Sequence, residues 1–188
     1  MSTNDCHEIL LKHFQGGVGD VVKSVPKPPS LTEEKDGIFY FYLDPTEKVG
    51  DDVLIEDRAK ILLNLSNNSM MHKGLIKIAI IPGWLFPDEK RTTRQIRRYA
   101  NRRGFIPPDM KTPLLIRSKF SDQEIRDKMG IWWVVGMSRP IINNEYPFLL
   151  GTDINVGQYR IDRCLTIYSG KRSVEWIREY GFAFIDPT

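Results

Sequence analysis

The chain has 188 residues, of which 41% are hydrophobic and 27% are charged, and its net charge at neutral pH is +3. A chain of this length and composition buries a substantial core, which excludes wholesale disorder. It contains no apolar run of membrane-spanning length, and residues 1–5 lack the features of a signal peptide. We therefore expect a soluble, cytoplasmic protein that does not enter membranes. Its two cysteines, Cys6 and Cys164, are expected to be free thiols, the alternative being one long-range disulfide.

The first 35 residues are predicted to be separate from the core. Residues 4–14 have the pattern of a short amphipathic helix, in which Asp5 and Glu8 have the spacing of a capping box. The segment that follows is rich in proline, which removes backbone donors and favours an extended chain. The predicted organisation is an N-terminal helix with a proline-rich strap at 1–35 and a core domain at 36–188.

The core begins with alternating strands and helices. A turn at Asp36-Gly37 precedes a predicted strand at 38–43, and a helix at 53–65 and a strand at 75–81 follow. Next comes a basic helix from Thr92 or Thr93 to Arg103, ended by Gly104. Thr112 is predicted to cap a helix at 114–120, and Ser121 and Glu124 form a capping box for another that ends at Gly130.

Four apolar runs of strand composition close the chain, at 131–135, 146–150, 159–168 and 182–185. Short strands joined by turns most simply form an antiparallel meander. Within 159–168 the odd-numbered residues apart from Arg163 are expected to face the core, and the even-numbered ones, including Tyr168, to face water or a partner. The sequence therefore predicts an α+β fold, a single domain with a mainly antiparallel sheet, a C-terminal β-meander and several short helices.

Known catalytic and cofactor motifs are missing from the sequence. His7 and His13 are six residues apart, which does not place them on one helix face. The glycines at 16–19 follow a helix, whereas a phosphate loop follows a strand. No G-x-S-x-G motif occurs, and Cys164 lies in the middle of a predicted strand. The sequence therefore predicts no metal, no cofactor and no assigned catalytic residue.

Charged residues near the C-terminal strands leave an enzymatic alternative open. General acid–base catalysis needs two titratable groups within reach of one substrate. Convergence on one face of the terminal sheet would bring together acidic and basic side chains of this region: Glu145, Asp153, Asp162, Arg160 and Arg163. Cross-strand ion pairs explain the same residues without any activity. An enzyme of unknown class is therefore a third hypothesis, behind two kinds of binding protein.

The basic helix is the main functional lead. Residues 88–103 contain seven basic and two acidic residues, so this segment carries +5 while the rest of the chain carries −2. At 100° per residue, four arginines share one side of the helix, namely Arg91, Arg94, Arg98 and Arg102, whereas Arg97 lies elsewhere. Arginine makes bidentate contacts to phosphate, and nearby aromatic rings can stack on unpaired bases. The candidate nucleic-acid-binding residues are Arg91, Arg94, Arg98, Arg102 and Arg103, together with Tyr99 and Trp84.

These features favour a non-enzymatic protein that binds nucleic acid nonspecifically through residues 90–103. An acidic protein partner would use the same arginines. A second hypothesis is a protein–protein adaptor or assembly subunit that uses exposed aromatic residues, Trp84 and Trp176, with arginines at the rim. A third account of the helix is a solvated surface element whose arginines pair with Asp88, Glu89 or other carboxylates. The sequence does not determine the oligomeric state.

Overall fold

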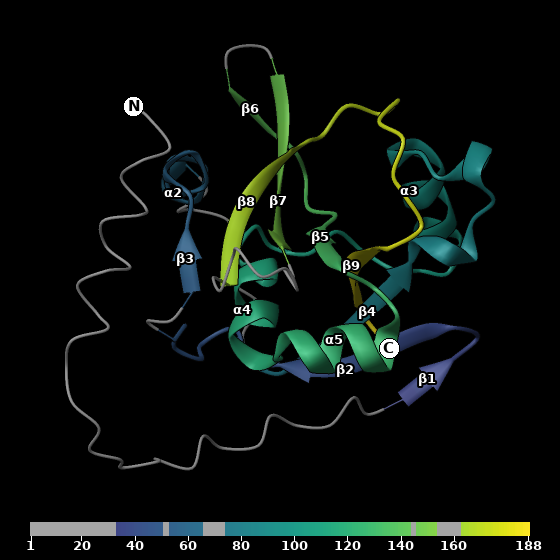
Figure 1. Ribbon diagram of the computed structural model, residues 1–188, viewed down its shortest axis with the longest axis horizontal. Helices are drawn as coiled ribbons and strands as arrows, with labels where there is room; N and C mark the ends of the chain where they lie inside the picture. The colour runs from purple at the N-terminus through teal and green to yellow at the C-terminus, as the bar shows by residue number, and fades with distance from the viewer. Residues whose placement is uncertain (1–32, 51–52, 66–73, 144–145, 154–162) are drawn as a thin grey trace.

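The computed structural model describes residues 33–50, 53–65, 74–143, 146–153 and 163–188, shown in colour in Figure 1. The predicted N-terminal helix and Cys6 lie outside the described residues, as do residues 159–162 of the predicted strand at 159–168. Within the described part of the chain, nine strands form one mixed sheet that is mostly antiparallel, and helices pack on both of its faces. The predicted α+β class is therefore confirmed. None of the described helices is long and apolar enough to cross a membrane.

Eight strands follow one another across the sheet in the order β1-β2-β4-β9-β5-β7-β8-β3, and β6 pairs with β7 alone. The strands in sheet order are β1 (Glu33–Lys35), β2 (Ile38–Leu43), β4 (Ile76–Pro82), β9 (Tyr180–Asp186), β5 (Trp133–Gly136), β7 (Tyr146–Asp153), β8 (Arg163–Ser169) and β3 (Val53–Ile55), with β6 at Ile141–Asn143. Two pairs are parallel, β5 with β9 and β3 with β8. The helices are α2 (Asp57–Leu65), α3 (Thr93–Arg102), α4 (Thr112–Lys119) and α5 (Asp122–Met129), with short 3₁₀ turns η1 (Gly83–Leu85) and η2 (Asp88–Lys90).

Both faces of the central strands are buried. Along β4, Ile78 and Ile80 pack toward α4 and α5, whereas Ala79 and Ile81 pack toward α3. This double burial explains why β4 is a nearly continuous apolar run, since each face of a covered strand needs apolar side chains. Helices α2, α4 and α5 cover one face, and α3 covers the other together with the loop that precedes β9 (Figure 1).

Several local predictions are confirmed. The strands expected at 38–43 and 75–81 are β2 and β4, and the basic helix is α3. Ser121 and Glu124 form the expected reciprocal capping box at the start of α5. Gly130 ends this helix in the left-handed conformation, with φ of 62°. Asp36 and Gly37, both with positive φ, make the tight turn that joins β1 to β2, although β1 itself was not predicted.

Two predicted helix starts are wrong. The helix expected at 53–65 begins only at Asp57, because Val53–Ile55 pairs with β8 as a parallel edge strand and buries Val53. β-Branched Val53 and Ile55 suit that pairing better than a helix start. Thr112 is the first residue of α4 and not its cap, which is Lys111. The Thr112 hydroxyl is buried and has no hydrogen-bond partner in the described part of the chain.

The last strand does not continue the order of its predecessors. β7 pairs antiparallel with β5 and β8, as a meander requires, but β9 pairs with β4 and β5 in the centre of the sheet. The loop before β9 therefore crosses the sheet face on which Tyr168 lies. The Tyr168 ring packs against Trp176 and Tyr180, so its predicted exposure to water is wrong. The alternating pattern assigns Tyr168 to the solvent because it assumes that one face of the sheet is uncovered, whereas the loop before β9 covers this face.

Candidate anion-binding site on helix α3

Helix α3 packs on the sheet through a narrow apolar face. Ile96 and Ala100 are fully buried against the sheet and Tyr99 is partly buried against the same core, while much of the remaining circumference is occupied by arginines. The Thr92 side chain accepts a hydrogen bond from the Gln95 N–H and caps the first turn. Gly104, with φ of 82°, follows the last turn in the conformation that glycine adopts most easily.

The loop between β8 and β9 is bonded to the start of this helix. The N–H groups of Thr93 and Arg94 donate to the carbonyls of Val174 and Arg172 at 3.0 and 3.1 Å. The Trp176 indole N–H donates to the Thr93 hydroxyl at 2.9 Å. These bonds satisfy helix N–H groups that have no partner within the helix itself. They also hold Arg172 beside the helix, although it lies far from α3 in the sequence.

Five arginines converge on a depression of about 430 Å³. Four come from α3 and the fifth from the docked loop; the depression is lined by Arg94, Arg97, Arg98, Arg102, Arg172 and Asn101. We call these five arginines the arginine cluster. Four of them are exposed, and Arg97 is partly buried. Among the described residues, none of the five forms a salt bridge with a carboxylate.

Arg97 forms the inner wall of the cluster. Its guanidinium donates to the Ser138 carbonyl at 2.6 Å, which fixes the side chain against the segment after β5. Burial lowers the pKa of Arg97 below its ordinary value, and the positive charge of Arg172 lowers it further. The prediction that Arg97 lies away from the other arginines is therefore wrong, because a long side chain reaches the depression from the flank of the helix.

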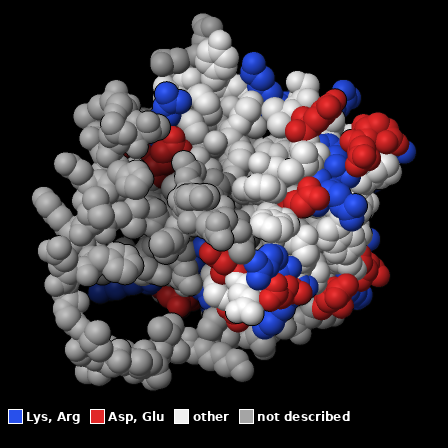
Figure 2. Space-filling view, viewed as in Figure 1, with Lys and Arg blue, Asp and Glu red and all other residues white. Residues whose placement is uncertain are grey.

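Mutual repulsion within the cluster favours the binding of an anion there. Uncompensated like charges raise the free energy of the empty site, and an anion that binds there relieves the repulsion. Arg94, Arg98 and Arg102 follow one another at intervals of four residues, so their Cα atoms span about 12 Å along the helix. That length exceeds one phosphate group and suits several successive phosphates on a polymer. Figure 2 shows a different pattern on the face that it displays, where basic and acidic side chains lie close together.

Arg91 does not belong to the cluster, and its predicted role in binding is corrected. Only 6% of the residue is exposed. Its guanidinium donates to the carbonyls of Gly83, Phe86 and Trp176 at 2.9, 3.0 and 3.2 Å, and it pairs with Asp88. The side chain therefore joins η1, η2 and the loop before β9. Four of its five N–H donors are thus engaged within the fold, and the side chain does not line the arginine cluster.

Arg103 and Tyr99 lie toward a different part of the surface. Arg103 pairs with Asp36 at 3.3 Å, and its guanidinium lies 5.0 Å from the centre of the Tyr99 ring. The Tyr99 ring packs edge-on against Phe86 with centroids 5.1 Å apart. Both residues are thus engaged within the fold, and neither lines the arginine cluster.

The two tryptophans considered for binding are also engaged within the fold. Trp84 is 38% exposed and lies against the β1–β2 turn at Gly37, and its indole N–H points to the Met129 carbonyl at 3.5 Å. It does not line the arginine cluster. Trp176 was expected to be exposed, but it is buried among Tyr168, Tyr180 and Phe182. Trp176 is therefore not accessible to a protein partner.

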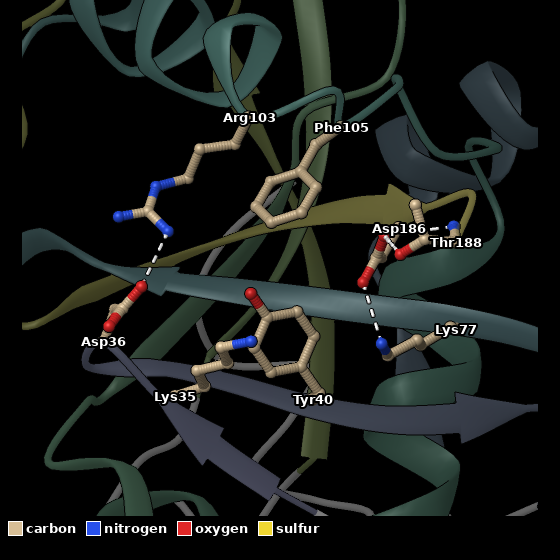
Figure 3. A pocket seen from close by; sticks show the side chains of 8 residues that line it. All are labelled: Lys35, Asp36, Tyr40, Lys77, Arg103, Phe105, Asp186 and Thr188. Atoms are coloured by element: carbon tan, nitrogen blue, oxygen red, sulfur yellow. Dashed lines mark hydrogen bonds and ion pairs between the residues drawn. The ribbon is translucent and has the colours of Figure 1, made fainter.

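A second, smaller hollow of about 310 Å³ lies beside the β1–β2 turn (Figure 3). Two of its three cations pair with carboxylates: Lys77 pairs with Asp186 at 3.0 Å, and Arg103 pairs with Asp36, while the third cation is Lys35. Burial disfavours the charged form of Asp186, but hydrogen bonds from Thr188 and Lys77 outweigh it and lower the pKa of this carboxyl. Burial raises the pKa of the Tyr40 phenol in the same hollow. Most of the charge in this hollow is thus compensated by ion pairs, unlike that of the arginine cluster.

Comparison of the chain with protein-family models, curated proteins and solved structures finds no match. Within the described residues there is also no group of three or more histidine, cysteine or acidic side chains that could hold a metal ion. Three residues of the enzymatic hypothesis, Glu145, Arg160 and Asp162, lie outside the described residues. Among the described residues, the arginine cluster is therefore the main candidate functional site.

Sequence reasoning identified the helix and three of the five cluster residues, Arg94, Arg98 and Arg102. It missed Arg97 because the helical angle alone ignores the length of the side chain. It missed Arg172 because nothing in the local pattern shows where that loop docks. A signal was present in the sequence: Lys171-Arg172 is a basic pair in a turn, which could have marked the loop as a second basic element.

Proposed function

We propose that this protein binds nucleic acid through the phosphate backbone, with the arginine cluster as the contact surface. The observation that carries the proposal is the convergence of five guanidinium groups with no salt-bridged carboxylate among the described residues. A row of arginines about 12 Å long suits a chain of phosphates better than a single small anion. Contacts to phosphates carry no sequence information, so binding is expected to be nonspecific.

Counterion release gives this proposal a quantitative signature. Five arginine–phosphate contacts predict that the logarithm of the affinity falls with the logarithm of salt concentration with a slope of about −3.5 to −4.5. Affinity should therefore drop by about two orders of magnitude between 50 and 200 mM salt. Fluorescence anisotropy with labelled oligonucleotides of about 20 residues measures this slope directly.

Charge reversal on the helix tests the location of the site. The variant Arg94→Glu, Arg98→Glu, Arg102→Glu should lower affinity by at least about 100-fold at 100 mM salt, since it replaces three attractions by repulsions. The matched control reverses three arginines elsewhere, the exposed Arg58 and Arg178 and the half-buried Arg126. Each reversal changes the charge by two units, so both variants take the net charge from +3 to −3.

The comparison between the two variants decides the outcome. A loss confined to the helix variant, with circular dichroism spectra unchanged, supports the cluster as the binding surface. Equal losses of affinity in both variants would mean that net charge alone governs nucleic-acid binding, and the proposed site would be wrong. Arg172→Glu is a further check, because it removes a cluster residue without altering the helix. Its affinity should fall about 10-fold.

A further inference from the structure

Positive charge is concentrated at one end of the arginine cluster. The Arg94 N–H donates to the Arg172 carbonyl at 3.1 Å, so Arg172 lies at the start of α3. Arg97 follows Arg94 by three residues, a spacing that makes the two side chains neighbours on the helix surface. Burial, and after it the positive charge of Arg172, lowers the pKa of Arg97, as expected for guanidinium groups that lie close together. Three arginines therefore meet at this end, whereas Arg98 and Arg102 continue the cluster along the helix.

We call Arg94, Arg97 and Arg172 the head of the cluster, and Arg97 is held in position for a ligand there. Its guanidinium donates to the carbonyl of buried Ser138 at 2.6 Å, which is its one hydrogen bond among the described residues. A guanidinium has five N–H donors, so most of them remain for a ligand. Because the side chain is already partly buried and held, binding costs it less conformational entropy than it would cost a free surface arginine.

The positive charge ends at the head. Residues 88–91, just before the helix, are neutral together, since Asp88 and Glu89 balance Lys90 and Arg91. Glu175 adds a negative charge, and its backbone pairs with that of Thr92, the residue that caps α3. A polyanion that continued past the head toward the start of the helix would leave three cations for a surface that is neutral or negative. A strand that ends at the head avoids this loss of attraction.

We infer that the head binds the terminal phosphate of a nucleic-acid strand, a phosphomonoester, while Arg98 and Arg102 hold the phosphodiesters that follow it. This inference rests on the proposed function. A phosphomonoester carries a charge of about −1.5 to −2 at pH 7 and three strong acceptor oxygens, more than a phosphodiester within the strand offers. Three converging guanidinium groups therefore suit the terminal group better than an internal one. The same chemistry occurs at a 5′ or a 3′ end, and the experiment distinguishes the two.

Oligonucleotides that differ only at their ends test the inference. Oligodeoxythymidines of about 20 residues with an internal fluorescent label carry a 5′-phosphate, a 3′-phosphate or hydroxyl groups at both ends. One additional charge-assisted contact predicts that at least one phosphorylated form binds about 10-fold more tightly than the hydroxyl form at 100 mM salt. The end that gives the advantage identifies the direction of the strand. Methyl esterification of that phosphate, which removes one charge but keeps the group, should abolish most of the advantage.

Alanine substitutions locate the contact within the cluster. Arg97→Ala and Arg172→Ala should each reduce the preference for the phosphorylated end from about 10-fold to below about 3-fold. Arg102→Ala is the matched control, because it removes the same charge from the opposite end of the same cluster. It should weaken the binding of all the oligonucleotides by a similar factor and leave the preference unchanged. Arg172 is exposed on a loop, so its variant decides the test if Arg97→Ala disturbs the fold.

The outcomes separate the two proposals. Equal affinity of the wild type for the phosphorylated and hydroxyl forms, with loss of binding in the helix variant, would overturn the inference and leave the phosphate surface intact. An equal reduction of the preference by Arg102→Ala and Arg172→Ala would also overturn it, as would thymidine monophosphate that binds as tightly as the phosphorylated strand. Failure of the wild type to bind any of the oligonucleotides at 50 mM salt would overturn the proposed function itself, and the inference with it.

Discussion

Replacing Arg91 with alanine should destabilise the domain, in contrast to the same change at Arg94 three residues away. Arg91 is buried and donates to three backbone carbonyls. The Gly83 carbonyl keeps a second donor, the Phe86 N–H at 3.0 Å, so two carbonyls lose their donor. At about 1–3 kcal/mol for each, with some loss of packing by the side-chain stem, the free energy of unfolding should fall by about 3–5 kcal/mol.

Urea unfolding followed by tryptophan fluorescence measures this difference. The unfolding midpoint of Arg91→Ala should fall by about 1–3 M, whereas exposed Arg94→Ala should stay within about 0.5 kcal/mol of the wild type. The melting temperature of Arg91→Ala should fall by about 6–20 °C. A loss of less than about 1 kcal/mol for Arg91→Ala would refute the reasoning, because it would mean that the three carbonyls find other donors at little cost.

Two further predictions concern the sheet. Asp186 has a lowered pKa in the fold, so its ion pair with Lys77 stabilises the protein above the unfolded-state pKa of about 3.9, and this stabilisation is lost as pH falls through the folded-state pKa. The difference in unfolding free energy between wild type and Asp186→Asn should therefore be constant above about pH 5 and shrink by pH 3; a constant difference in urea titrations at pH 7 and pH 3 would contradict this. Gly136→Ala should lower the unfolding free energy by about 1–3 kcal/mol, because the new Cβ would lie 2.6 Å from the Pro113 ring in α4. An unchanged melting temperature would show that α4 can shift without cost.

Short-range features of the fold could be predicted well from sequence. Ser121, Glu124 and Gly130 specify a helix through bonds and dihedral angles that involve only neighbouring residues. The apolar run of β4 likewise contains its own signal, since both faces need apolar side chains. The prediction failed where a distant partner decides the conformation. Val53–Ile55 has enough helical spacing to continue into α2, but pairing with β8 makes it a strand.

The candidate site could be predicted only in part, for the same reason. The spacing of Arg94, Arg98 and Arg102 along one helix determines that they share a side. Arg91 precedes the helix, and whether its guanidinium faces water or backbone carbonyls depends on where η1 and the loop before β9 lie. Arg172 joins the cluster through the same loop. Sequence periodicity contains no information on how a loop of this kind docks.

The central place of β9 also constrains how the protein can be made. β4 and β5 do not pair with each other, and β9 lies between them and bonds to both. During synthesis on the ribosome, the halves of the sheet on either side therefore have no shared hydrogen bonds until residues 180–186 emerge. A nascent chain that ends before Tyr180 would expose two unpaired apolar strand edges, which are prone to aggregation. Formation of the native sheet must accordingly await the emergence of β9 from the ribosome.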